Sequence, residues 1–169
     1  MTSTGTERTP RRETPGTPTD PAAAQPAKSE GAAFRLLLFG VGARVYGCDI
    51  ADIREIVPNR PATRLPGAPD HVRGLINLRG TIVTVVDLAR RIDGGEARPD
   101  GSIILVDRGS RQVGLLVDDV RDVQPVASDR FETATDDLSR GGLVRGLGHL
   151  DDGVVIVLDV LWLVGQIVG

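Results

Sequence analysis

From residue 34 onward, short apolar runs alternate with glycines, charged residues and other turn formers. The runs are rich in Val, Leu and Ile, which favour strands, and turn residues bound each of them. This pattern predicts an all-β barrel or sandwich with two or three short helices, because helical periodicity is clear only in Asp49–Ile56 and Asp159–Val168. The predicted strands contain the runs Leu36–Phe39, Val45–Cys48, Leu75–Leu78, Ile82–Val86, Ile103–Val106, Val113–Val117 and Val154–Leu158.

The pattern also contains an internal repeat. Residues 44–56 align without a gap with residues 111–123, and residues 72–87 align in the same way with residues 144–159. Because the two blocks keep their order, we infer a duplicated β unit and two similar small barrels. The repeat leaves open whether each barrel is contiguous or exchanges strands with the other. The identical pairs include Arg44 and Arg111, Gly47 and Gly114, Asp52 and Asp119, Arg54 and Arg121, Gly74 and Gly146, Val85 and Val157, and Asp87 and Asp159.

Asp87 and Asp159 each follow a matched strand and precede a helical pattern. A carboxylate in that position accepts a hydrogen bond from a free backbone N–H at the start of the helix, so we predict a structural capping role. The stretch Asp159–Val168 is apolar on almost every side. A helix of that kind is expected to be buried, here against a barrel or at the seam between the lobes.

Residues 1–32 consist mainly of Thr, Pro, Ala and Gly, and contain five of the eleven prolines. Such a segment buries too little apolar surface to offset its ordering entropy, so we predict a disordered tail followed by a folded unit, residues 33–169. No apolar stretch is long enough to cross a bilayer, and the single cysteine fits a reducing compartment. We therefore expect a cytoplasmic protein.

Residues typical of catalytic or metal sites are sparse. His71 and His149 are the only histidines, and neither has a second histidine three or four residues away. Cys48 lies in a strand-like run and is interpreted as a small core residue. Asp118 and Asp119 would point to opposite faces of a strand, so we interpret them as solvated turn residues. We predict no catalytic residue, no metal site and no cofactor.

One turn differs between the halves although the strands around it match. The first half has Arg79-Gly80 where the second has Asp151-Asp152. Two interpretations of Arg79 remain open from the residues alone. It is either a solvated turn residue or a fixed cation that one lobe has and the other lacks.

The segment GLINLRGTIVTVVDL, residues 74–88, closely resembles the signature of CheW-type domains. So do YGCDI at 46–50, REI at 54–56, LPGAP at 65–69, GLLVD at 114–118 and GLG at 146–148. The resemblance extends from Phe34 to Leu163 and implies two five-stranded SH3-like β-barrels, in agreement with the repeat. Thr84 in place of a usual proline and Cys48 in place of a usual aliphatic residue depart from the family pattern.

The resemblance implies a non-catalytic adaptor that couples chemoreceptors, the methyl-accepting chemotaxis proteins, to a CheA-type histidine kinase. The cytoplasmic hairpin tip of the receptor would lie in an apolar groove between the lobes. The regulatory domain of the kinase would dock end to end through barrel edges, and other CheW-like domains are further candidate partners. The protein would be recruited from the cytoplasm to membrane receptor arrays without inserting into the membrane. The family positions that line the groove match Ile53, Ile56, Gly74, Val120 and Val123.

The functionally sensitive arginine of the family matches Arg79, and the acid expected to pair with it matches Glu55. Two other classes of function compete with the adaptor. An enzyme is disfavoured by the lack of a catalytic constellation. Another β-barrel binding module, outside chemotaxis, is the main alternative. Within that class, binding of nucleic acid is disfavoured by a formal net charge of −3 and an aromatic content of 3%, because such proteins need a basic groove with stacking aromatics.

Overall fold

The computed structural model describes residues 32–168, and eleven strands dominate them. The predicted disordered tail, residues 1–32, lies outside the described residues except for Ala32, where the first strand begins. The strands are β1 (Ala32–Val41), β2 (Arg44–Asp49), β3 (Glu55–Pro58), β4 (Val72–Leu78), β5 (Thr81–Asp87), β6 (Ser102–Arg108), β7 (Arg111–Val117), β8 (Asp119–Ala127), β9 (Phe131–Thr133), β10 (Val144–Leu150) and β11 (Gly153–Leu158). The helices are η2 (Ile50–Asp52), α2 (Leu88–Ile92), η3 (Ser128–Arg130), α3 (Asp136–Ser139), η4 (Arg140–Gly142) and α4 (Val160–Val168).

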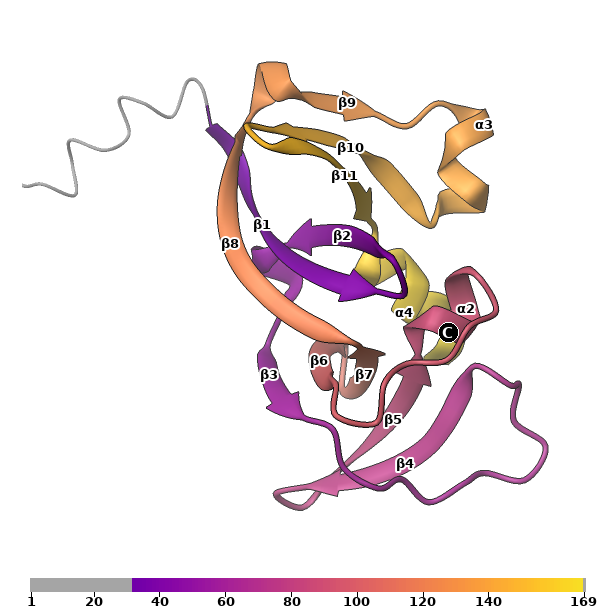
Figure 1. Cartoon of the computed structure of the whole chain (residues 1–169). Helices are drawn as coiled ribbons and strands as arrows, with labels where there is room; N and C mark the ends of the chain where they lie inside the picture. Colours follow the sequence, from indigo (N-terminus) through magenta and orange to yellow (C-terminus); the bar gives the residue numbers. More distant parts are fainter. Residues whose placement is uncertain (1–31, 169) are drawn as a thin grey trace, which may run out of the picture.

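The strands form two curved sheets, one for each lobe, which lie one above the other in Figure 1. The six-stranded sheet has the order β8-β1-β2-β11-β10-β9, and the five-stranded sheet has the order β3-β6-β7-β5-β4. Each sheet therefore combines the hairpin of one half of the sequence with the remaining strands of the other half. The lobes exchange their hairpins, which answers the question that the repeat left open.

The strand pairing confirms the duplication position by position. In the five-stranded sheet, Val85 pairs with Gly114 across the parallel strands β5 and β7. In the six-stranded sheet, Val157 pairs with Gly47 across β11 and β2, which are also parallel. These are the residues that the two blocks of the repeat align. The order of the first five strands is also the same in both sheets, and β9 adds a sixth strand to one of them.

A short segment closes each barrel along its open edge. In the five-stranded sheet, Thr63 forms an isolated bridge with Leu75 of β4, with two backbone N–H···O bonds of 2.8 Å. In the other sheet, Glu132 of β9 pairs with Leu147 of β10, which the repeat aligns with Leu75. The segment after β3 thus covers Leu75 in one lobe, and the segment after β8 covers the equivalent residue, Leu147, in the other.

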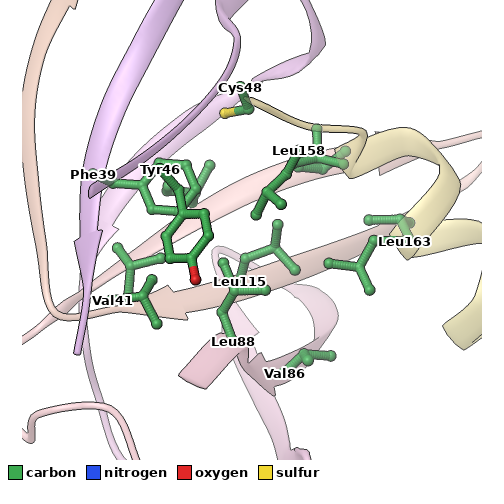
Figure 2. Packing of buried hydrophobic residues seen from close by; sticks show 14 of the residues in the cluster. Phe39, Val41, Tyr46, Cys48, Val86, Leu88, Leu115, Leu158 and Leu163 are labelled. Atoms are coloured by element: carbon green, nitrogen blue, oxygen red, sulfur yellow. The ribbon is translucent and has the colours of Figure 1, made fainter. Parts of the chain in front are cut away.

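The largest of the described apolar clusters lies at the seam and joins the two exchanged hairpins. Phe39 and Tyr46 from the first hairpin pack in one cluster with Leu115 from the second (Figure 2). Cys48 belongs to this cluster and has no exposed surface, and burial raises the pKa of its thiol to about 12. The prediction that Cys48 is a core residue is confirmed. Each sheet also encloses a smaller cluster, which includes Val83, Ile103 and Leu116 in one lobe and Leu36, Val126 and Val157 in the other.

Helix α4 packs against the same seam, as its apolar composition predicted. Val160, Leu163 and Val164 have no exposed surface and belong to the seam cluster, whereas Leu161 is 37% exposed. Asp159 caps the helix, because its Oδ1 accepts a hydrogen bond of 2.8 Å from the backbone N–H of Trp162.

Asp87 caps α2 in the corresponding place, where its Oδ1 accepts a bond of 3.2 Å from the N–H of Arg90. The same carboxylate is fully buried and also accepts bonds from the N–H of Ala97, which fastens the segment after α2. Both capping predictions are confirmed.

Two expectations from the sequence are wrong. The stretch Asp49–Ile56 is not one helix, because only the 3-10 turn η2 forms before the chain enters β3. Asp49 caps that turn by accepting a bond of 2.9 Å from the N–H of Ala51, and pairing of Ile56 with Ile104 of β6 makes the rest a strand. Asp118 is not merely solvated, because its two oxygens accept bonds of 2.7 Å from the backbone N–H groups of Gly42 and Arg98.

Candidate functional site

The turn between β4 and β5 has an unusual backbone. Leu78 pairs with Thr81, so Arg79 and Gly80 form a two-residue hairpin loop. Both have positive φ, 51° for Arg79 and 86° for Gly80, as in a type I′ turn, where Asn and Gly are preferred. The N–H of Gly80 donates a hydrogen bond of 2.9 Å to the side-chain oxygen of Asn77. An arginine with positive φ is uncommon and suggests that the side chain has a role beyond closing the hairpin.

Arg79 forms the contact that we expected with Glu55. Its Nη2 donates a hydrogen bond to Oε1 of Glu55, the first residue of β3. Strands β3 and β4 are the opposite ends of the sheet order, so the curvature of the barrel brings the pair together. The side chains are 66% and 32% exposed, which limits the contribution of the pair to stability to about 0–1 kcal/mol. Its effect is to fasten the turn to the strand that carries Ile56.

The equivalent turn of the other lobe differs in conformation as well as in sequence. Among the described residues, only Arg79 and Arg140 have positive φ without being glycine, so the loop Asp151-Asp152 has another geometry. Asp151 Oδ1 instead accepts a bond of 2.9 Å from Nη1 of Arg130, which belongs to η3. The contact between Arg79 and Glu55 is therefore specific to one lobe, as expected.

The predicted groove residues other than Gly74 lie on matched positions of the two lobes. Ile53, Val120 and Val123 are partly buried and pack against the seam cluster. Ile56 is 39% exposed and lies on β3, an edge strand. The structure thus brings three of these side chains to one cluster at the seam and leaves Ile56 as the most accessible of the four.

The fold alone explains why position 74 is a glycine, without reference to a binding partner. It has φ of 140°, and an added Cβ would overlap the carbonyl group of Thr63, the residue that closes the barrel. Gly146, its repeat equivalent, lies under Glu132 of β9, whose carbonyl oxygen an added Cβ would also overlap. The same close approach of two backbones therefore requires glycine in both lobes.

The described residues offer little for catalysis or for metal binding. Within residues 32–168, no group of three or more His, Cys, Asp and Glu side chains is arranged to hold a metal ion. No helix in this part of the chain is both long and apolar enough to span a membrane. The described residues instead combine a cation held in an ion pair, Arg79, with an exposed aliphatic side chain, Ile56, on the strand to which it is bound, which suits recognition of another macromolecule.

Comparison with known proteins places this geometry in a family. The model of the family described as CheW-like domain matches residues 35–167. The chain belongs to the CheW-like family. It is 42% identical over 130 residues to chemotaxis protein CheW of Rhizobium meliloti, covering 74% of this chain and 83% of the relative. It is 33% identical over 129 residues to chemotaxis protein CheW of Klebsiella aerogenes, covering 73% and 77%.

A solved structure supports the same assignment. The scaffolding protein TtCheW from Thermoanaerobacter tengcongensis superposes with a TM-score of 0.69 at 30% identity, covering 77% of this chain and 86% of that one. The predicted fold of two β-barrel lobes is thereby confirmed. As a CheW-like protein, the chain is a non-catalytic chemotaxis coupling adaptor. The comparisons do not favour a β-barrel binding module outside chemotaxis.

Proposed function

We propose that this adaptor binds the cytoplasmic hairpin tip of a chemoreceptor with one surface and the regulatory domain of a CheA-type histidine kinase with another. The receptor surface consists of Ile53, Ile56, Val120 and Val123, together with the pair formed by Arg79 and Glu55. From the cytoplasm, the protein would in this way be recruited to receptor arrays at the membrane.

The main support for this receptor surface is the ion pair between Arg79 and Glu55. A strained turn holds the arginine, and the pair is too exposed to matter much for stability. Glu55 precedes Ile56, an exposed aliphatic residue that packs in none of the described apolar clusters. Successive side chains of a strand face opposite sides, so the ion pair fixes β3 from one face while Ile56 on the other face offers a helix tip an apolar anchor.

Gly74, which the family pattern also assigns to the groove, contributes indirectly in this proposal. It lies on β4, the strand that ends at the Arg79 turn, and it allows Thr63 to cover that strand. Its substitution would disturb the barrel on which the turn stands. A loss of receptor binding after such a substitution would therefore not show a direct contact.

The kinase surface is proposed at the barrel ends, where each lobe exposes an aliphatic side chain at the same position. Ile82 and Val154 are 57% and 58% exposed, and each is the second residue of the strand that follows the hairpin turn. The repeat aligns them. Apolar side chains so exposed at matched positions suit docking of a partner built from similar barrels.

The test uses two matched substitutions of exposed aliphatic residues, each of which should affect the binding of one partner only. Ile56→Asp should abolish pull-down of a receptor cytoplasmic fragment and leave binding of the kinase regulatory domain unchanged. Val154→Asp should weaken binding of the kinase domain and leave receptor binding unchanged. Both positions are exposed, so both variants should fold, which circular dichroism checks. Normal receptor binding by folded Ile56→Asp would place the receptor surface elsewhere.

A further inference from the structure

The β4 side of the five-stranded sheet contains a pocket of about 540 Å³ that has no part in the proposed receptor surface. It lies between the segment that follows β3, the start of β4 and the segment after α2. Apolar side chains, among them Ala62, Leu65 and Val85, form part of its lining, and Val85 is almost completely buried. Four arginines complete it: Arg60, Arg64, Arg73 and Arg90. We call it the arginine pocket.

Two of these arginines are held in place from inside the protein. The buried carboxylate of Asp87 has its Oδ2 3.8 Å from Nη1 of Arg73 and 3.9 Å from Nε of Arg90. Arg90 also pairs with Glu96, which lines the pocket and whose pKa this contact lowers. Because Asp87 is fixed by backbone hydrogen bonds, it provides a stationary negative charge that attracts both guanidinium groups before any ligand arrives.

The other two arginines lack such partners. In residues 32–168, neither Arg60 nor Arg64 has a carboxylate oxygen within 4.0 Å, and both are exposed. The lining contains four arginines against the carboxylates of Asp70 and Glu96, so positive charge is in excess there even when Asp87 is included. The chain as a whole carries a formal net charge of −3, so this excess is local.

We propose that the arginine pocket binds a compact organic dianion. Its acidic groups are two carboxylates or one phosphate monoester, which the planar guanidinium of arginine binds with paired hydrogen bonds. Its apolar part lies against the aliphatic lining, and the volume is in the range of small-molecule sites. Arg60 and Arg64 supply two guanidinium groups that have no carboxylate partner within 4.0 Å among the described residues. The site goes beyond the adaptor function and does not rest on it.

The test is a titration of the full-length protein, followed by amide chemical shifts in NMR spectra. Phthalate probes a dicarboxylate, phenyl phosphate probes a phosphate monoester, and neutral benzyl alcohol controls for the aromatic ring. We expect saturable shifts with at least one dianion, centred on residues 59–65, 68–73 and 96–99, and none with benzyl alcohol. The tighter of the two dianions identifies the acidic group. Binding should weaken as salt is added.

Matched arginine substitutions separate the pocket from general charge. Arg60→Ala with Arg64→Ala should weaken binding by about tenfold or more, because each charged hydrogen bond is strong. Arg35→Ala with Arg111→Ala removes the same charge from exposed positions outside the pocket and should change affinity by less than about twofold. Absence of saturable shifts at the pocket amides would overturn the proposal. Equal weakening by the two pairs in folded variants would overturn it as well.

Discussion

At the scale of single residues, Arg79 shows how a position can matter to function and hardly to stability. Its backbone is in the left-handed region, which costs an L-residue about 1–2 kcal/mol relative to glycine. Its ion pair with Glu55 is too exposed to return more than about 0–1 kcal/mol. Glycine would therefore serve stability at this position at least as well, and the presence of arginine needs an explanation other than stability.

We predict that Arg79→Gly leaves the free energy of unfolding within about 1 kcal/mol of the wild-type value. Loss of the ion pair and relief of the positive φ largely offset each other, since glycine also raises the entropy of the unfolded chain. Urea denaturation measures this directly. A destabilisation well above that limit would mean that the pair has a structural role that its exposure does not suggest.

Gly74 and Gly146 illustrate the opposite case, in which folding is enough to explain a residue. We predict that alanine at either position costs about 1–3 kcal/mol or more, because the new Cβ would overlap the carbonyl group of the segment that closes the barrel. Gly153→Ala is the control, since Gly153 has a similar φ of 149° and open space around it. Equal denaturation midpoints for Gly74→Ala and Gly153→Ala would contradict this account of the close approach.

At the scale of the elements, local signals in the sequence predicted most strands and both helix caps. The runs of β-branched residues and the positions of Asp87 and Asp159 are short-range features, which sequence patterns report well. The expected helix at Asp49–Ile56 failed because pairing of β3 with β6, distant in sequence, decides its conformation. The backbone bonds of Asp118 escaped prediction for the same reason, because their donors, Gly42 and Arg98, lie in two other segments.

Helix α4 allows a matched test of burial within one element. Leu163 has no exposed surface and packs in the seam, whereas Leu161 is partly exposed on the same helix. We predict that Leu163→Ala costs about 2–5 kcal/mol and that Leu161→Ala costs distinctly less. Deletion of residues 160–169 should destabilise the protein by several kcal/mol, because at least three buried aliphatic side chains are lost. A deletion variant that melts like the full chain would show that the seam does not need the helix.

At the scale of the whole molecule, the exchange of hairpins makes each lobe depend on both halves of the chain. The repeat predicted two similar lobes but left their connection open, because matched residues look the same whether or not strands are exchanged. The contact between Arg79 and Glu55 was expected from the family resemblance alone. The residues themselves left Arg79 undecided, since its partner is distant in sequence and is brought near only by the curved sheet.

The exchange predicts that half of the chain does not fold alone. A fragment of residues 1–95 contains the hairpin of β1 and β2 but lacks β8 and β11, the strands that flank it. Its circular dichroism should show no cooperative melting, and addition of a fragment of residues 96–169 should restore it. Cooperative melting of the first fragment alone would contradict the exchanged topology.

The central claim is that this protein joins a receptor to a kinase through a surface oriented by Arg79. The most direct measurement is co-sedimentation of a CheA-type kinase with receptor-containing membranes in the presence of the protein. The wild type should carry the kinase into the pellet, whereas Arg79→Gly, although folded and about as stable, should leave most of it in solution. Wild-type recovery of the kinase with folded Arg79→Gly would contradict the account.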